Sequence, residues 1–512
     1  MRFNDILREL GLAYVMDIKG MKRFAPKNTD RLLELVREIT SKNLKVSIDP
    51  DSDPDGMFSA LIVKKMFDKL GYKNYEVNKI LSKRHGITDA IVSNTITNKV
   101  KVLFILDSST NSLELIKKLC DNDVYVVIID HHVSDYYYEN YPDKCIIINP
   151  RIEALYRETP YAEVSAGFLS AMVCDFILTK MGFSINTDLY IYGYVTIYSD
   201  ICRLDNPYNI SIVNKFCNSK LSIPKEIKIF MDERYDSLCR SFVSYKVIPR
   251  INALFRLEKF QILNSLFFEI DEMNDKEVYN LVTMIEDYYQ EAKQLSSKIE
   301  SLAKKEVYDS FVLLKLDNIM EYMSHPISIV KNFTGLACQS LSETHSCAII
   351  SLISVSDTEY KGSVRDGLNR NVLKRFKRHC QCGGHPSAFG FKVNKTEYQR
   401  WLSRISNSLN ALEKSNAKEY YTIDADDKDI DEQLIYLASY NELSGTGSLP
   451  SIYVRLTLTS ATPIKYFEKY TTITWNGKKV VSFDKTLREG DEVFIKPTLT
   501  KSGINYYVNT IK

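Results

Sequence analysis

Acidic and histidine side chains follow three apolar stretches near the start of the sequence. Residues 44–48 are followed by four aspartates within seven positions: Asp49, Asp51, Asp53 and Asp55. Residues 100–106 end at Asp107, and residues 124–129 end at Asp130, His131 and His132. Crowded carboxylates repel one another unless a cation neutralises them, and oxygen ligands suit hard ions such as Mg²⁺ or Mn²⁺. The pattern predicts a divalent-metal site, although a single acidic stretch of this kind is also typical of a solvated turn.

The elements that must position these side chains are parallel strands. Residues 100–106 and 124–129 are almost continuously apolar and β-branched, which is typical of strands buried on both faces of a sheet. Residues 57–70 have the apolar spacing of a helix that follows the first strand. Open α/β sheets bind ligands at the carboxyl ends of their strands, so we expect the three acidic segments to meet at one edge. The predicted fold class is a doubly wound parallel α/β sheet.

With these motifs in view, the chain resembles the DHH phosphoesterase superfamily, and within it the RecJ branch of single-strand-specific exonucleases. The Asp130–His132 motif and the upstream aspartates carry the resemblance, and the glycine-histidine motif at residues 383–386 resembles that of the DHH-associated domain. Four further segments fit the same family: Asn149-Pro150, Ser165-Ala166-Gly167, Tyr198-Ser199-Asp200 and Gly362-Ser363-Val364-Arg365. The resemblance extends over roughly residues 40–500, and its motifs are specific only as a set.

The resemblance implies a ligand set for two Mn²⁺ or Mg²⁺ ions, with Asp107 bridging them: Asp53, Asp55, Asp107, His131 and Asp200. It also implies that Asp130 orients a histidine and that His132 contacts a phosphate oxygen, so both are assigned to catalysis. Asp49 stands where many relatives have histidine and some RecJ-like proteins have an apolar residue. We assign it as a further metal ligand, with occupancy of that first site left open; Asp51 has no assigned role. Asp200 could instead cap a helix.

Two basic segments are candidates for holding the substrate. Arg84 and His85 lie in a basic loop that resembles a RecJ segment facing the active site, although an exposed loop explains it equally well. The resemblance places a second group on loops over the cleft: Ser363, Arg365, Gly383, Gly384 and His385. Glycines allow backbone amides to approach an anion, so this group is predicted to bind substrate phosphate. A surface pairing of Arg365 with Asp366 is the alternative, and a zinc site around Cys380 and Cys382 is disfavoured by its spacing.

The chain of 512 residues is long enough for several domains. We predict N-terminal helices and a DHH catalytic domain over 1–218, a helical connector over 219–307 and a smaller α/β DHH-associated domain over 308–418. A C-terminal OB-like β-barrel is predicted over 419–512, because short strands with turn signals follow an acidic linker. The connector includes a long amphipathic helix over 277–307. Tyr470, Trp475 and Tyr506 are candidates for stacking on bases, although aromatics in a small barrel are as often part of its core.

Composition limits the remaining possibilities. The net charge of +2 gives no global basic signature, so any contact with nucleic acid must be local. Scattered cysteines and the lack of an apolar span or signal segment predict a cytoplasmic protein with free thiols and no membrane contact. The resemblance implies a 5′-to-3′ exonuclease on single-stranded nucleic acid, DNA rather than RNA, with single-strand-binding or replication and repair proteins as partners. Two alternatives stay open: a phosphodiesterase for oligoribonucleotides or cyclic dinucleotides, and a non-catalytic DNA-binding replication factor.

Overall fold

A computed structural model describes Ile6 and residues 26–154, 162–184, 187–202, 204, 206–216, 222–235, 237–316, 319–342, 347–367, 370–385, 387–412, 420–425, 430–443, 451–500 and 503–509. The chain divides into two compact units. The first comprises residues 1–249, 264–278 and 418–512, and the second comprises residues 250–263 and 279–417. The boundaries of the four predicted domains stay a prediction. In the described parts of the chain, no helix combines the length and apolar character needed to cross a membrane.

The N-terminal sheet in the first unit is wholly parallel, with the strand order β2-β1-β3-β4-β5. Its strands are β1 (Val46–Pro50), β2 (Tyr75–Val77), β3 (Val102–Leu106), β4 (Tyr125–Ile129) and β5 (Cys145–Ile148). Residues of β1 and β3 are buried throughout, and β3 has the unbroken apolar sequence expected of such a strand. The strand order reverses direction between β1 and β3, and such a switch point is where open α/β sheets form their ligand crevice.

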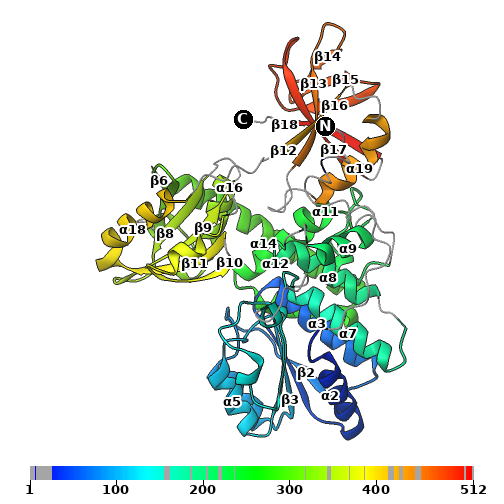
Figure 1. The fold of residues 1–512 in the computed structure, drawn as a ribbon, viewed down its shortest axis with the longest axis vertical. Coiled ribbons are helices and arrows are strands. Elements are labelled where there is room, and N and C mark those ends of the chain that lie inside the picture. Colours follow the sequence, from blue (N-terminus) through cyan, green and yellow to red (C-terminus); the bar gives the residue numbers. More distant parts are fainter. Residues whose placement is uncertain are drawn as a thin grey trace. The chain divides into compact units, whose positions relative to one another are not determined.

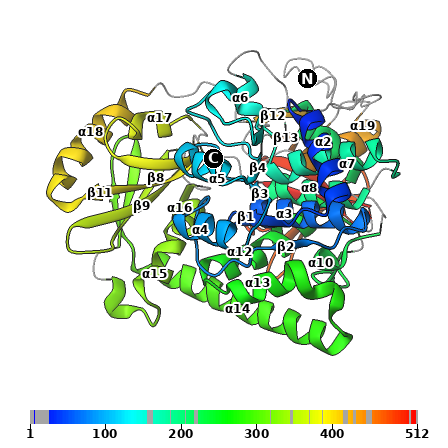
Figure 2. The same ribbon diagram turned by 90° about the horizontal axis from the view of Figure 1, so that it is seen from below.

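Helices cover both faces of this sheet, as the sequence predicted. On one face, α4 (Asp89–Thr97) and α5 (Leu113–Asp121) pack on alternate residues of β3 and β4 in a shared apolar core. On the other lie α2 (Thr29–Lys42), α3 (Pro54–Lys69) and α7 (Ala166–Lys180), which are blue and green in Figures 1 and 2. The remaining helices of residues 150–216 are α6 (Pro150–Ala154), α8 (Thr187–Ser199) and α9 (Pro207–Phe216).

Short helices connect the parallel sheet to the second unit. They are α10 (Lys225–Lys228), α11 (Arg240–Phe242), η3 (Val243–Val247), α12 (Ile248–Arg256), α13 (Phe260–Asn264), η4 (Ser265–Glu269) and η5 (Ile270–Glu272). The long helix α14 follows over Asp275–Leu302. It ends five residues before the predicted end at residue 307, because Lys304–Val307 form strand β6 against β7 (Phe311–Lys315).

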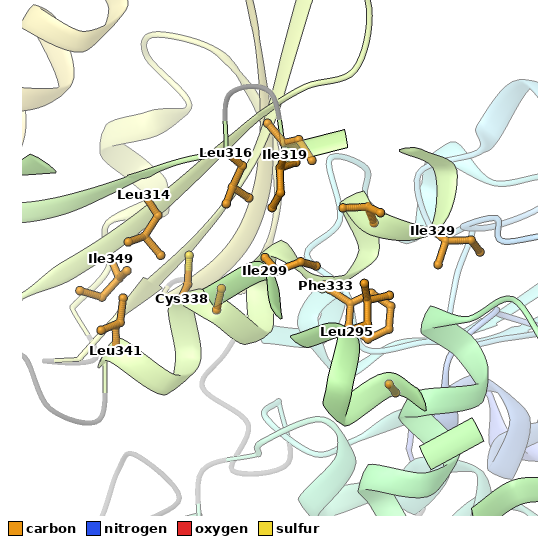
Figure 3. Close-up of a cluster of buried hydrophobic side chains, with 14 of the residues drawn as sticks. Leu295, Ile299, Leu314, Leu316, Ile319, Ile329, Phe333, Cys338, Leu341 and Ile349 are labelled. Carbon is orange, nitrogen blue, oxygen red and sulfur yellow. The ribbon is translucent and has the colours of Figure 1, made fainter. Parts of the chain in front are cut away.

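The second unit is built on a mixed sheet with the order β10-β11-β9-β8-β7-β6. Its other strands are β8 (Ala348–Ser354), β9 (Glu359–Asp366), β10 (Gln381–His385) and β11 (Ala388–Asn394). One face packs on α14, α15 (Ile327–Val330) and α16 (Thr334–Ser342) in the cluster drawn in Figure 3, where Cys338 and Leu341 lie beside Leu314 and Ile349. The other face packs on α17 (Leu373–Phe376) and α18 (Tyr398–Asn410). Short 3₁₀ turns fill the connections: η6 (Ile319–Tyr322), η7 (Lys331–Phe333) and η8 (Lys395–Glu397).

The C-terminal strands form a third sheet with the order β12-β13-β17-β18-β16-β15-β14. Its elements are β12 (Tyr420–Asp424), α19 (Ile430–Leu443), β13 (Ser451–Thr457), β14 (Ile464–Tyr466), β15 (Thr471–Trp475), β16 (Lys478–Ser482), β17 (Glu492–Thr500) and β18 (Gly503–Asn509). The turn at Asn476 and Gly477, both with positive φ, joins β15 to β16, as is typical of an Asn-Gly hairpin. The OB-like character of this sheet stays a prediction.

Candidate metal centre

The loop after β1 is closed tightly enough to hold three aspartates around one point. A Cβ on Gly56 would lie 2.7 Å from the backbone nitrogen of Asp51, so only glycine fits there. Asp53 caps helix α3, accepting a hydrogen bond from the Gly56 amide at 2.9 Å. Asp55 lies in the first helical turn and is buried. The close contact with Gly56 and the helix cap therefore fix the direction of the loop that carries the acids.

Asp107 follows β3 in a strained conformation. Its φ is +62°, which is uncommon for a residue other than glycine and is typical of functional sites. The side chain is buried, and within the described chain its Oδ1 accepts no hydrogen bond. The nearest imidazole nitrogens to this oxygen are His131 Nε2 at 3.3 Å and His132 Nδ1 at 3.8 Å. A buried carboxylate oxygen without a hydrogen-bond donor is what a metal ligand looks like before the ion is added.

At the end of β4, Asp130 organises the two histidines. Its Oδ1 accepts hydrogen bonds from the amides of His131 and His132 at 2.7 and 3.1 Å, and lies 2.7 Å from His132 Nδ1. Its Oδ2 accepts the Thr110 hydroxyl at 2.6 Å, and Asn149 Nδ2 donates to that hydroxyl and to the His132 carbonyl. The Asp130 carboxylate is thus fully used by hydrogen bonds, which suits the positioning role predicted for it. Thr110 and Asn149 complete this network, and sequence analysis assigned them no role.

His131 is the meeting point of the centre. Its Nε2 lies 3.3 Å from Asp107 Oδ1, 3.6 Å from Asp200 Oδ2 and 3.8 Å from Asp55 Oδ2. Asp200 follows the last turn of α8, while Asp55 is held by two amides at the start of α7, those of Ala166 and Gly167, at 2.8 and 2.7 Å. Gly167 is required here because a Cβ would lie 2.6 Å from the Thr196 side chain. Acids carried by three elements, α3, β3 and α8, therefore converge on one imidazole.

Burial and the charges of neighbouring groups shift the pKa values of the acids and of His132 in this cluster. Burial, followed by the charges of neighbouring aspartates, raises the pKa of Asp55 and of Asp107 well above its ordinary value, and raises that of Asp53 to about 6. His132 behaves oppositely, because Asp130 outweighs the effect of burial and raises the imidazole pKa to about 10. Burial opposes ionisation of Asp130 too, but His132 holds its pKa below the ordinary range. A divalent cation would remove the repulsion among the acids.

The donor atoms fit metal ions in three overlapping groups, each with its ligand atoms within 4.8 Å of one another. The groups are Asp107-His131-His132, Asp55-His131-Asp200 and Asp51-Asp53-Asp107. Asp107 belongs to two groups, as expected of a residue predicted to bridge two ions. The structure thus brings together all five predicted ligands of the family pattern. It adds Asp51, which sequence analysis left without a role although its spacing of two from Asp53 and of four from Asp55 was visible.

Asp49 differs from the expectation that it binds metal. It is buried, and its carboxylate receives both guanidinium nitrogens of Arg84, with NH1 3.0 Å from Oδ2 and NH2 2.8 Å from Oδ1. Asn78 Nδ2 donates to Oδ1 at 2.8 Å. Asp49 belongs to none of the three donor groups found among the described residues. The cation beside it is a protein side chain, so the structure does not bring Asp49 to the metal ligands.

The loop of residues 84–86 also contacts Asp51, which belongs to one of the donor groups. His85 Nδ1 lies 2.9 Å from Asp51 Oδ2, and the Gly86 amide donates to Oδ1 at 3.0 Å. The hydrogen bond to Asp51 raises the pKa of the exposed His85 imidazole. Arg84 and His85, both predicted to bind substrate, are therefore occupied by acids of the β1 loop in this structure. Their assignment to the substrate stays a prediction.

A second polar site lies in the second unit. Sequence analysis expected Ser363 and Arg365 on loops, but the structure places them on a strand beside helix α16. Ser363 and Arg365 lie within β9, paired on both sides by β8 and β11. The Ser363 hydroxyl is 3.0 Å from that of Thr334, and a Cβ on Gly335 would lie 2.9 Å from an Arg365 guanidinium nitrogen. Asp366 pairs with Arg370 at 2.7 Å, so the predicted alternative of an Arg365–Asp366 pair is wrong.

Arg256 is a residue of this second site that sequence analysis missed. Burial, and then the nearby charge of Arg365, lower the pKa of Arg256 to about 10; burial likewise lowers the pKa of Arg365. Neither guanidinium has a carboxylate within 4 Å among the described residues. Because like charges are placed together only at a cost, a pair of this kind is a candidate anion site. Gly383 and Gly384 lie on the exposed edge strand β10, and the side chain of His385 lies outside the described residues.

The aromatic candidates of the third sheet divide by exposure. Trp475 is 5% exposed and packs edge-on against Tyr506, so it belongs to the core. Tyr470 is half-buried and stacks on Phe467 with a centroid distance of 4.8 Å. Phe467 and Phe483 are exposed, and Lys479 lies over the Tyr470 ring. The exposed aromatics of this sheet thus include Tyr466, Phe467 and Phe483, with the half-buried Tyr470 stacked on Phe467.

Comparisons with known proteins agree with this arrangement. The model of the DHH family, N-terminal domain, matches residues 45–180. RecJ from Thermus thermophilus in complex with Mn²⁺ is 15% identical, with a TM-score of 0.70 over 99% of this chain and 74% of that chain. A structure of exonuclease RecJ bound to manganese is 16% identical, with a TM-score of 0.54 over 77% of this chain and 97% of that one. No curated protein matches the sequence.

Residues 45–180 form a DHH-family N-terminal domain, whose parallel sheet carries most of the acid and histidine cluster at its switch point. The fold of the chain is RecJ-like, since RecJ matches the chain over nearly its whole length. The RecJ structures contain Mn²⁺ or Mg²⁺, the ions that the sequence predicted for this chain.

Proposed function

We propose that this protein is a divalent-metal-dependent exonuclease that hydrolyses phosphodiester bonds in single-stranded DNA from the 5′ end. The observation that carries the proposal is the overlap of three donor groups on Asp107 and His131, because shared ligands are what two neighbouring ions require. Asp51, Asp53 and Asp107 would hold one ion, and Asp55, His131 and Asp200 the other. Asp107, which also forms a donor group with His131, would be shared between the two ions. When bound, such ions activate a water and stabilise the charge that develops on the phosphate.

The protein's own contribution is to fix charges before the substrate arrives. Asp130 holds His132 at Nδ1, and half of the His132 side chain is exposed. With its pKa raised to about 10, the imidazole is a cation at neutral pH and has its Nε2 proton available for a phosphate oxygen. Charged donors that need no rearrangement stabilise a transition state most effectively. This supports the phosphate-contacting role proposed for His132.

Recognition of the strand's end is assigned to the two arginines of the second unit. An arginine holds a phosphate through two parallel hydrogen bonds, and Arg256 adds a second charge beside Arg365. A terminal phosphate carries more negative charge than an internal one, so a doubled cation favours it. The Ser363 and Thr334 hydroxyls, 3.0 Å apart, add neutral donors to the same site.

The exposed aromatics of the third sheet support single-strand binding. Base–aromatic stacking contributes about 1–3 kcal/mol per base and tolerates any sequence. Phe467 and Tyr470 form a stacked pair at the surface, and lysines flank them at positions 465, 469 and 479. A platform of this chemistry suits unpaired bases, which double strands do not offer.

The experiment that tests the proposal is hydrolysis of end-labelled substrates by the purified protein with Mn²⁺ or Mg²⁺. Single- and double-stranded DNA and RNA with 5′-phosphate or 5′-hydroxyl ends are compared, with EDTA as the control. We expect mononucleotides to be released from single-stranded DNA. Cleavage of short RNA or cyclic dinucleotides in place of DNA would favour the small-substrate alternative. Binding of DNA without hydrolysis in either metal would favour the non-catalytic one.

A further inference from the structure

A basic surface lies where helix α18 meets the start of β10 and the end of β11. It borders a cavity of about 170 Å³, and we name it the α18 surface. Its lining residues are His379, Cys380, Gln381, Lys392, Val393, Asn394, Glu397, Arg400, Trp401 and Arg404. Three permanent cations and one histidine thus face a single carboxylate, that of Glu397. The surrounding sequence is similarly biased, because residues 370–404 contain nine lysines and arginines and one acid.

Two of the three permanent cations of this surface have no ion-pair partner among the described residues. Arg400 and Arg404 are exposed and one turn apart on α18, and neither has a carboxylate within 4 Å among the described residues. Lys392 reaches Glu359 only at 3.9 Å. Like charges four residues apart destabilise a helix by a few tenths of a kcal/mol. The helix therefore carries a small cost that an anionic ligand would remove.

The α18 surface is distinct from the Ser363–Arg365 site. Helix α18 packs through Trp401, Ile405 and Leu409 on the same face of the sheet as Val364. Side chains alternate between faces along a strand, so Ser363 and Arg365 point to the opposite face. Their contacts with Thr334 and Gly335 at the start of α16 agree with this. The two arginine pairs of the second unit therefore serve different faces of one sheet.

The chemistry of the surface favours a phosphate backbone over a protein partner. Protein interfaces have cores enriched in aromatic and apolar residues and depleted of charge. Of the large hydrophobic side chains exposed in the described chain, none lies between residues 359 and 410. Trp401, which borders the cavity, is 3% exposed and belongs to the core. Backbone contacts to nucleic acid, in contrast, use arginine and lysine without an apolar centre.

We propose that the α18 surface binds the phosphate backbone of single-stranded nucleic acid, independently of the metal centre and of the Arg256–Arg365 pair. The inference rests on the proposed function for the identity of the polyanion. Arg400 and Arg404 would each contact a phosphate. Their role is to lengthen the bound segment of a strand and to raise its affinity, with no part in the reaction.

The test is the salt dependence of binding for the full chain in EDTA, so that no hydrolysis occurs. A fluorescent oligothymidine is titrated at several salt concentrations with wild type and with the Arg400→Gln/Arg404→Gln variant. Removing one phosphate contact lowers the slope of log Kobs against log salt by about 0.7 for a single strand, so we expect a slope shallower by about 1.4. The matched control is Lys298→Gln/Lys305→Gln, which removes two exposed charges from α14 and β6. Strand β6 is the opposite edge of the same sheet, and the control should keep the wild-type slope.

Turnover of a dinucleotide by the metal-loaded protein separates this inference from the proposed function. It should be unchanged in the Arg400→Gln/Arg404→Gln variant, because a dinucleotide is too short to need the surface. A wild-type slope in that variant overturns the inference. A second result also overturns the inference: the variant loses the binding of polyglutamate that wild type shows but keeps the binding of oligothymidine. The surface would then serve an acidic protein. Failure of wild type to cleave any substrate would instead contradict the proposed function and leave the binding test valid.

Discussion

The pairing of Asp49 with Arg84 predicts that Asp49 supports the metal centre without binding an ion. Asp49 is 1% exposed and Arg84 is 16% exposed, with two hydrogen bonds of 2.8 and 3.0 Å between them. Removing one partner of a buried ion pair costs about 3–5 kcal/mol, because the other charge stays buried. We therefore expect Arg84→Ala to destabilise the apo-protein strongly. The combined change Asp49→Val/Arg84→Met should recover most of that stability.

Metal titration by calorimetry distinguishes a supporting residue from a ligand. Asp49→Asn keeps the side-chain shape and the Asn78 contact, so we expect the number of Mn²⁺ ions bound to equal that of wild type. Asp51→Asn is the matched variant two residues away. It should weaken or abolish the binding of one ion, because Asp51 belongs to a donor group. The unfolding midpoint of wild type and of both variants in EDTA is the second measurement, and it reports stability without bound metal. Loss of an ion in Asp49→Asn with both ions retained in Asp51→Asn would refute the reasoning.

Three further predictions follow from the centre and the anion site. Under the proposed function, Asp107→Asn should abolish hydrolysis in steady-state assays while the unfolding midpoint in EDTA is kept or raised, since it removes the residue proposed to bridge the two ions and a buried carboxyl group. Arg365→Ala should raise KM on 5′-phosphorylated strands roughly ten- to a hundred-fold, and Arg365→Lys should recover only part of it; equal kinetics on phosphorylated and hydroxyl ends in wild type would contradict this. The raised pKa of Asp53, about 6 against an ordinary 3.8, gives stability that is complete below about pH 3.8 and lost as the pH rises through 6. The apo-protein should therefore gain more from Mn²⁺ at pH 7.5 than at pH 5 in thermal-shift measurements, and an equal gain at both would count against a repulsive cluster.

The sheet and its ligand edge could be predicted from the sequence because they follow from local patterns. Apolar runs mark β3 and β4, and the acids Asp107 and Asp130 follow these runs directly. In β1 the shorter apolar run ends at Ile48, and Asp49 follows it within the strand. Parallel pairing then brings Asp107 and His131 to the same edge without further information. Predictions of this kind depend only on periodicity and on where a strand ends.

The partners of individual charges could not be predicted, because they depend on contacts between segments far apart in the chain. Arg84 could face a phosphate or an acid, and only the fold of residues 78–86 beside β1 brings it to Asp49. Arg256 lies more than a hundred residues from Arg365, and no sequence motif links the two. Sequence analysis assigned Arg365 to one phosphate-binding group with Gly383, Gly384 and His385, and it gave Arg400 and Arg404 no role. In the sheet, alternation along β9 and the packing of α18 separate them from Arg365.

The Asp49–Arg84 pair connects the acid at position 49, where many relatives have histidine, to the rest of the metal centre. An acid at this position, beside the ligands at residues 51, 53 and 55, would add a further repulsive charge if it were left free. Arg84 neutralises it within the protein, and the same loop then supplies the contacts of His85 and Gly86 to Asp51. A histidine at position 49 would bring no negative charge, and Arg84 would lose its carboxylate. The identity of residue 49 therefore determines both the charge of the first site and whether Arg84 is available to a substrate, so the two properties should change together when Asp49 is replaced.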